Sequence, residues 1–148
     1  MRGRVLGIDV GERRVGLAIS DPSGTLARPL ETLNVTGSAD AVDRVVAAIT
    51  RLSAEDDGLS AIVVGVPLRL DGSQTKQTAH VVAFIDALRA RTSLTVVTEG
   101  EQLSSVEAES RLAVRERDWR VRKKKLDAAA AAVILQDYLD RERRTLEP

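Results

Sequence analysis

Three acidic residues occupy positions from which their carboxylates could meet in a folded domain. Asp9 ends a short apolar run that predicts a buried strand, and ligand sites in open α/β sheets lie beyond the carboxyl ends of strands. Glu101 follows a second predicted strand, and Asp127 begins an alanine-rich predicted helix. If the two strands are parallel neighbours, the carboxylates converge at one edge of a sheet.

Three such carboxylates would repel one another strongly unless a cation neutralised them. Hard oxygen ligands suit Mg²⁺ or Mn²⁺. Two such ions about 4 Å apart can activate a water molecule and stabilise the leaving oxygen when a phosphodiester is hydrolysed. The residues therefore predict a site, with two metal ions, in which Asp9, Glu101 and Asp127 are both metal ligands and catalytic residues.

Each of these residues also fits a role without metal. Asp9 precedes Val10-Gly11, and aspartate is common in turns. Glu101 could be a solvated residue near a helix cap, and Asp127 would be a good N-cap for the helix that follows it. Taken one at a time, the residues leave these alternatives open.

The apolar periodicity predicts the elements that would position the carboxylates. Strands are expected at 5–10, 15–19, 25–33, 61–66 and 94–97, and helices around 42–49 and 81–88 and at 104–114 and 127–140. Pro29 places the third strand at an edge or a bulge. A hairpin meander followed by βα units predicts an α/β fold, with a mixed five-stranded sheet of antiparallel meander plus parallel strands, flanked by helices.

Composition limits the class of protein. The chain has 148 residues, 43% hydrophobic and 30% charged, which is typical of one globular domain, so residues 1–148 are expected to form a single domain. The absence of cysteine excludes disulfides and thiolate metal sites. No apolar run is long enough for a signal peptide or a membrane span, so we expect a cytoplasmic protein with no membrane partner.

A basic segment precedes Asp127, although the net charge of the chain is zero. Residues 115–125 lack apolar periodicity and include Arg120, Arg122, Lys123, Lys124 and Lys125. A mobile loop that grips phosphates is expected here, the alternative being a solvated loop. Arg13 and Arg14, in the first hairpin, are expected to contact the nucleic-acid backbone near the cut. With one Phe, one Trp and one Tyr, the chain favours shape and backbone contacts over base stacking.

Four motifs, in order along nearly the whole chain, resemble the YqgF family, also called RuvX. They are Gly7-Ile8-Asp9-Val10-Gly11 with residues 14–21, Val64-Gly65-Val66-Pro67-Leu68 with residues 71–73, residues 101–109, and Lys124-Lys125-Leu126-Asp127 with residues 129–136. The resemblance implies an RNase H-like fold. It also implies a nuclease that processes the 5′ end of pre-16S ribosomal RNA or resolves Holliday junctions.

By the same resemblance, Asp9, Glu101 and Asp127 take the positions of the family's acidic triad. The third motif departs from the family pattern, because Gly100 stands where an aspartate is usual and Gln102 where an arginine is usual. Glu99 could supply the missing carboxylate, so the second acidic ligand is either Glu99 or Glu101.

Two other functions compete with the nuclease. The altered third motif is compatible with a non-catalytic RNase H-like module that only binds nucleic acid. The first hairpin also resembles that of actin-like or sugar-kinase-like ATPases, which need two such domains where this chain has room for one. A homodimer is expected, because a four-way junction is cut on two strands related by a near two-fold axis, whereas a single cut in ribosomal RNA needs only a monomer.

Overall fold

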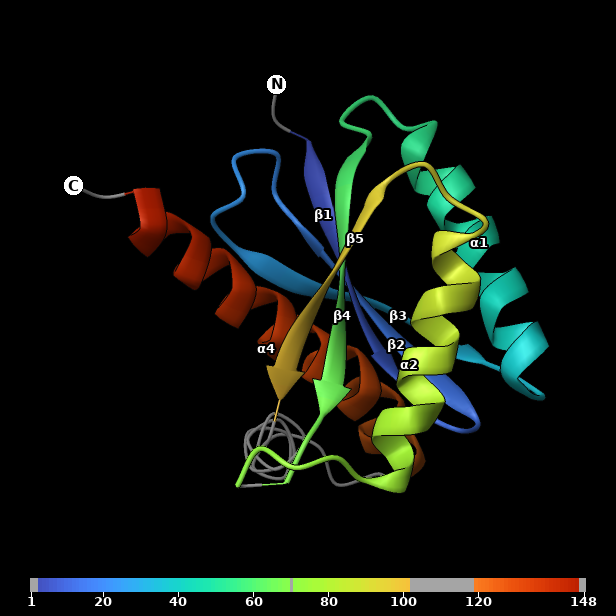
Figure 1. Cartoon of the computed structure of the whole chain (residues 1–148). Helices are drawn as coiled ribbons and strands as arrows, with labels where there is room; N and C mark the ends of the chain where they lie inside the picture. The colour runs from blue at the N-terminus through green and yellow to red at the C-terminus, as the bar shows by residue number, and fades with distance from the viewer. Residues whose placement is uncertain (1–2, 70, 102–118, 147–148) are drawn as a thin grey trace.

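The computed structural model describes residues 3–69, 71–101 and 119–146. Within these ranges the elements are β1 (Arg4–Val10), β2 (Arg14–Ser20), β3 (Ala27–Asn34), α1 (Ser38–Ser53), β4 (Leu59–Pro67), α2 (Lys76–Arg89), β5 (Thr95–Glu101) and α4 (Trp119–Leu146) (Figure 1). No helix in the described ranges is long and apolar enough to cross a membrane.

The five strands form one mixed sheet in the order β3-β2-β1-β4-β5. β1 pairs antiparallel with β2 and parallel with β4, so the predicted meander followed by parallel strands is confirmed. Pro29 lies on the edge strand β3, where the register with β2 shifts. Both features agree with the prediction, because proline has no N–H to give to a ladder.

Helices cover both faces of the sheet (Figure 1). On one face, the inward side chains of β1, β2 and β4 pack with the apolar stripes of α1 and α2 in the larger core cluster. On the other face, a smaller cluster joins Val5, Ala18 and Val63 to the apolar residues of α4. Strand side chains alternate between these clusters, and Asp9 takes its place in the alternation on the α4 side.

Three strand glycines let α4 approach the sheet closely. A Cβ placed on Gly7 would lie 2.7 Å from the Cβ of Leu135, and one on Gly65 would lie 2.4 Å from the Cδ1 of Ile134. A Cβ on Gly16 would lie 1.9 Å from the carbonyl oxygen of Asp127. Because the missing side chains leave a shallow trough across β2, β1 and β4, the helix packs almost against the strand backbones.

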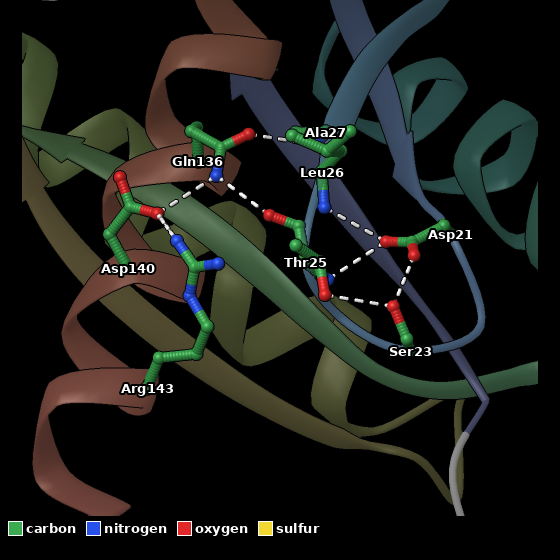
Figure 2. Close-up of polar contacts among 8 residues, drawn as sticks. All are labelled: Asp21, Ser23, Thr25, Leu26, Ala27, Gln136, Asp140 and Arg143. Carbon is green, nitrogen blue, oxygen red and sulfur yellow. Dashed lines mark hydrogen bonds and ion pairs between the residues drawn. The ribbon is translucent and has the colours of Figure 1, made fainter. Parts of the chain in front are cut away.

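A side-chain network fixes α4 against the hairpin between β2 and β3 (Figure 2). The Gln136 amide accepts from the Ala27 N–H at 2.9 Å and donates to the Thr25 carbonyl at 2.9 Å. Asp21 shapes that hairpin by accepting from the Ser23 hydroxyl and from the backbone N–H groups of Leu26 and Thr25, which together lower the pKa of Asp21 to about 2. The helix therefore has a fixed register on the sheet.

The structure corrects two predicted boundaries. Residues 119–125 were expected in a loop and Asp127 at a helix start, but α4 begins at Trp119, so both lie inside the helix. Arginine and lysine are good helix formers, and extending an existing helix costs little, so a missing apolar stripe does not indicate a loop. β5 continues to Glu101, beyond the predicted end at residue 97, because it pairs with β4 as far as Pro67. The predicted helix at 104–114 lies outside the described residues.

Gly7→Ala should lower the free energy of unfolding by about 1–3 kcal/mol, because the added methyl group would collide with the Leu135 Cβ. Gly37→Ala is the comparison variant, since a Cβ at Gly37 would meet nothing within 4 Å; Gly37 is the N-cap of α1, where alanine is less favourable than glycine, so a smaller loss than that of Gly7→Ala is expected. Urea denaturation of both variants measures the difference. Equal stability of the two would contradict the close packing of α4 on β1.

Candidate active site

Two of the three predicted ligands, Asp9 and Asp127, meet at the junction of β1, β2 and α4. Asp9 pairs across the sheet with Gly16. The backbone of Asp127 lies directly over Gly16, where no side chain intervenes. Gly16 is thus the structural link between two carboxylates that are far apart in sequence. The sequence offered one signal for it, since glycine inside a strand often marks a close backbone approach.

The Asp9 carboxyl group is partly buried and has a strongly shifted pKa. Burial, and second the negative charge of Asp127, raise the pKa of Asp9 to about 6. The ionised form of Asp9 is therefore disfavoured in the folded chain, first by loss of contact with water and second by the nearby charge of Asp127. A bound cation would remove that cost by favouring the ionised forms of both groups.

Among the described residues, Arg14 forms an ion pair with Asp127, one member of this acidic pair. Its Nε donates to Oδ2 of Asp127 at 2.7 Å, and the two side chains are 28% and 25% exposed. Arg14 was predicted to contact nucleic acid, whereas here it binds a predicted metal ligand. Arg13, its neighbour, is exposed.

The two alternative acidic residues of β5 differ in their positions. Glu99 is 5% exposed and forms a two-pronged ion pair with Arg141 of α4, whose Nη1 lies 3.1 Å from the Glu99 Oε2. Burial raises the pKa of Glu99, and the charge of Arg141 opposes this increase. Glu101 is the last residue of β5 and pairs with Pro67 at the carboxyl edge of the sheet. Its side chain lies outside the described part of the chain.

The remaining predicted contacts belong to the first part of α4. The structure gives the helical backbone there, and the side chains of Arg120, Arg122, Lys123, Lys124 and Lys125 lie outside the described part. Another contact at this edge was not predicted from the sequence. The Gln77 Nε2 donates to the Val10 carbonyl at 3.1 Å, which ties the start of α2 to the end of β1 beside Asp9.

The described residues fit part of a divalent-metal site. Among them no three His, Cys, Asp or Glu side chains are grouped closely enough to hold an ion, and the Glu101 side chain is not part of that set. Asp9 and Asp127 provide carboxylate oxygens, the donors that Mg²⁺ and Mn²⁺ prefer. Burial, and second the charge of Asp127, disfavour the ionised form of Asp9, and a cation bound between the two groups would favour it.

Comparison with known proteins identifies the family. The family model RuvX, described as Holliday junction resolvase, matches residues 3–141. A Chloroflexus aggregans protein named "Putative pre-16S rRNA nuclease" is 43% identical, over 94% of this chain and 94% of its own length. A Roseiflexus protein of the same name is 37% identical, over 95% of this chain and 96% of its own. The chain belongs to the RuvX family of nucleases.

Solved structures show that the family resemblance extends to the fold. RuvC of Thermus thermophilus, in complex with a Holliday junction substrate, aligns with a TM-score of 0.56 and 19% identity, over 97% of each chain. The fowlpox virus Holliday junction resolvase aligns with a TM-score of 0.54 and 13% identity, over 93% of this chain and 99% of its own. The predicted RNase H-like fold is confirmed.

Gly16→Ala should reduce nuclease activity much more than its effect on stability explains. The added methyl group would force the Asp127 backbone away from β2 and therefore away from Asp9. A displacement of about 1 Å at a catalytic group can cost about 100-fold in rate. The measurement is cleavage rate at a temperature where the protein is fully folded.

Gly7→Ala is the control, because it also crowds α4 but acts at Leu135, farther along the helix. This variant should keep most of its activity while also losing stability. Equal loss of activity in the two variants would mean that the effect comes from general loosening of α4.

Proposed function

We propose that this nuclease depends on a divalent metal, Mg²⁺ or Mn²⁺, held by Asp9, Glu101 and Asp127, with two ions in the site. The observation that supports this most is the convergence of Asp9 and Asp127 across Gly16, with its effect on the Asp9 pKa. These two residues belong to the first and last family motifs. A purely structural turn or cap would not require both charges at one point.

Bound metal would supply Lewis-acid activation of water and stabilisation of the leaving oxygen. The chain's own residues have simpler tasks. Asp9, at the end of the central strand, presents its carboxylate from a rigid position. Asp127 is carried by α4, which packs on the sheet. The hydrogen bonds of Gln136 to the β2–β3 hairpin keep α4 in register, so that the Asp127 carboxylate stays beside β2. Both groups must be ionised, and a cation lowers the pKa of each.

Glu101 is our choice for the second acidic ligand, for two reasons. Glu99 is buried and already neutralised by Arg141, so coordination of a metal would break that pair. Glu101 lies two residues farther along β5, at the edge toward which β1 also runs. The position of Glu101 in the third family motif also favours it as the second acidic ligand.

The substrate we propose is structured nucleic acid, and the first candidate is pre-16S ribosomal RNA. This is the substrate named for relatives that are 37–43% identical over nearly their full lengths. Holliday junctions are the second candidate, because the family model is described as a resolvase. Arg13 and the basic residues at 120–125 would contact the phosphates, and a homodimer would be needed only for paired cutting of a junction.

The substrate assay compares a ribosomal RNA precursor, a four-way DNA junction and plain duplex DNA. Each is incubated with pure protein and Mn²⁺ or Mg²⁺, and the product ends are mapped. A precise cut in the precursor supports the first candidate, and paired symmetrical nicks in the junction support the second. Binding of either substrate without any metal-dependent cleavage would favour the non-catalytic module.

Asp9→Asn should lower the cleavage rate by about 100-fold or more while leaving the folded state at least as stable. A carboxyl group with a pKa raised from 3.8 to about 6 destabilises the folded state at pH 7, where it is ionised. The neutral amide removes that cost. Cleavage assays and thermal unfolding at pH 7 in EDTA measure the two effects, and near wild-type activity would refute the proposed ligand set.

Glu101→Gln should reduce activity far more than Glu99→Gln, because only the first change removes a proposed ligand. The second change removes the buried partner of Arg141. The two variants share the same strand and the same chemical change, so each controls for the other. The reverse ranking in activity would make Glu99 the ligand.

A further inference from the structure

Arg14 is placed to act on Asp127, although it belongs to a hairpin where an arginine would be expected to meet substrate. Its Nε lies 2.7 Å from the Asp127 Oδ2, and this distance is typical of a charge-assisted hydrogen bond. Each side chain is about one quarter exposed, so the pair is only partly open to water. The contact joins residues 113 positions apart and cannot be read from either motif.

The backbone on both sides of this contact is firmly held. The Arg14 carbonyl accepts from the Gly11 N–H at 2.9 Å, which closes the tight turn between β1 and β2. A Cβ at Gly11 would lie 2.7 Å from the same carbonyl oxygen, so the turn is as compact as its glycine allows. On the other side, the Asp127 backbone lies against Gly16. The guanidinium therefore bridges two rigid elements.

A hydrogen bond of this kind determines which way a metal-binding carboxylate faces. Ligating carboxylates are usually oriented by a further hydrogen-bond donor, and loss of that donor weakens metal binding. Nε donates to Oδ2 of Asp127, and this contact restrains the rotation of the carboxylate. The Asp127 backbone also lies over Gly16, the strand partner of Asp9, so the two carboxylates repel each other and a nearby positive charge reduces that penalty.

We propose that Arg14 is a positioning residue, which orients the Asp127 carboxylate toward Asp9 for metal binding and is not itself a main contact for substrate phosphates. This inference rests on the proposed function, since it needs Asp127 to be a metal ligand. The inference gives the two neighbouring arginines of the hairpin different roles. Arg14 serves the site, and the exposed Arg13 remains for the nucleic-acid backbone.

The test measures the affinity for Mn²⁺ in the absence of nucleic acid, by the electron paramagnetic resonance signal of the free ion. Arg14→Gln should weaken Mn²⁺ binding by about 10- to 100-fold, the range for loss of a group that orients a ligand. Arg13→Gln is the matched control and should leave the Mn²⁺ affinity unchanged. Arg14→Lys, which keeps the charge and a donor, should recover part of the affinity.

A second measurement separates positioning from substrate contact. In Ca²⁺, which is expected to support binding without cleavage, the salt dependence of duplex binding should lose about 0.9 in log–log slope in Arg13→Gln and stay unchanged in Arg14→Gln. Unchanged or tighter Mn²⁺ binding in Arg14→Gln, or a slope lowered as in Arg13→Gln, would overturn the inference.

Asp127→Asn distinguishes failure of this inference from failure of the proposed function. If Asp127→Asn loses Mn²⁺ affinity while Arg14→Gln does not, Asp127 is a ligand that Arg14 does not position. If Asp127→Asn binds Mn²⁺ as well as the unsubstituted protein, the proposed metal site is itself wrong, and the inference fails with it. Thermal unfolding in EDTA confirms that each variant is folded.

Discussion

The close contact between α4 and the glycine-bearing face of the sheet is the constraint on which the candidate site depends. α4 crosses β2, β1 and β4 over Gly16, Gly7 and Gly65, and at each point an ordinary side chain would collide with it. At Gly16 the colliding atom would be the backbone of Asp127 itself. The packing that buries the smaller core therefore also sets the position of Asp127, the proposed ligand. Loss of packing and loss of site geometry are coupled at this strand.

Electrostatics in the site works against the fold rather than for it. Asp9 and Asp127 are held together even though burial and their mutual repulsion raise the pKa of Asp9 to about 6. Arg14 offsets part of this cost for Asp127 from one side. A cation bound between the two carboxylates would recover the free energy lost in bringing their charges together. The rest of the domain must be stable enough to hold them in place.

The Glu99–Arg141 pair ties one carboxylate of β5 to α4. Glu99 faces α4 in the sheet interior and is neutralised there, so β5 is tied to the far part of the same helix that carries Asp127. Glu101 is the last residue of the strand, where it pairs with Pro67 of β4. α4 therefore contacts the sheet near Asp127, at β2, and again near Arg141, at β5. These two contacts hold the helix on its diagonal path across the strands.

The sequence by itself determined much of this protein. Apolar periodicity predicted the five strands, their mixed pairing and the edge position of Pro29, because side-chain burial repeats with the period of each element. Motif order indicated the family and the acidic residues at 9, 101 and 127. Apolar periodicity gave the wrong boundary at two places. At the start of α4, Arg and Lys gave no apolar pattern although the chain is helical, and at the end of β5, pairing with β4 extends the strand.

Only the tertiary structure decided which partners these residues meet. Three contacts join segments that are distant in the sequence: Asp127 over Gly16, Arg14 with Asp127, and Arg141 with Glu99. No local propensity encodes them, since an arginine at a strand start or in a helix is equally compatible with solvent, phosphate or a carboxylate. The choice follows from the path of α4 across the sheet. That path depends on where the missing side chains of three glycines leave room, and on the packing of the whole face at once.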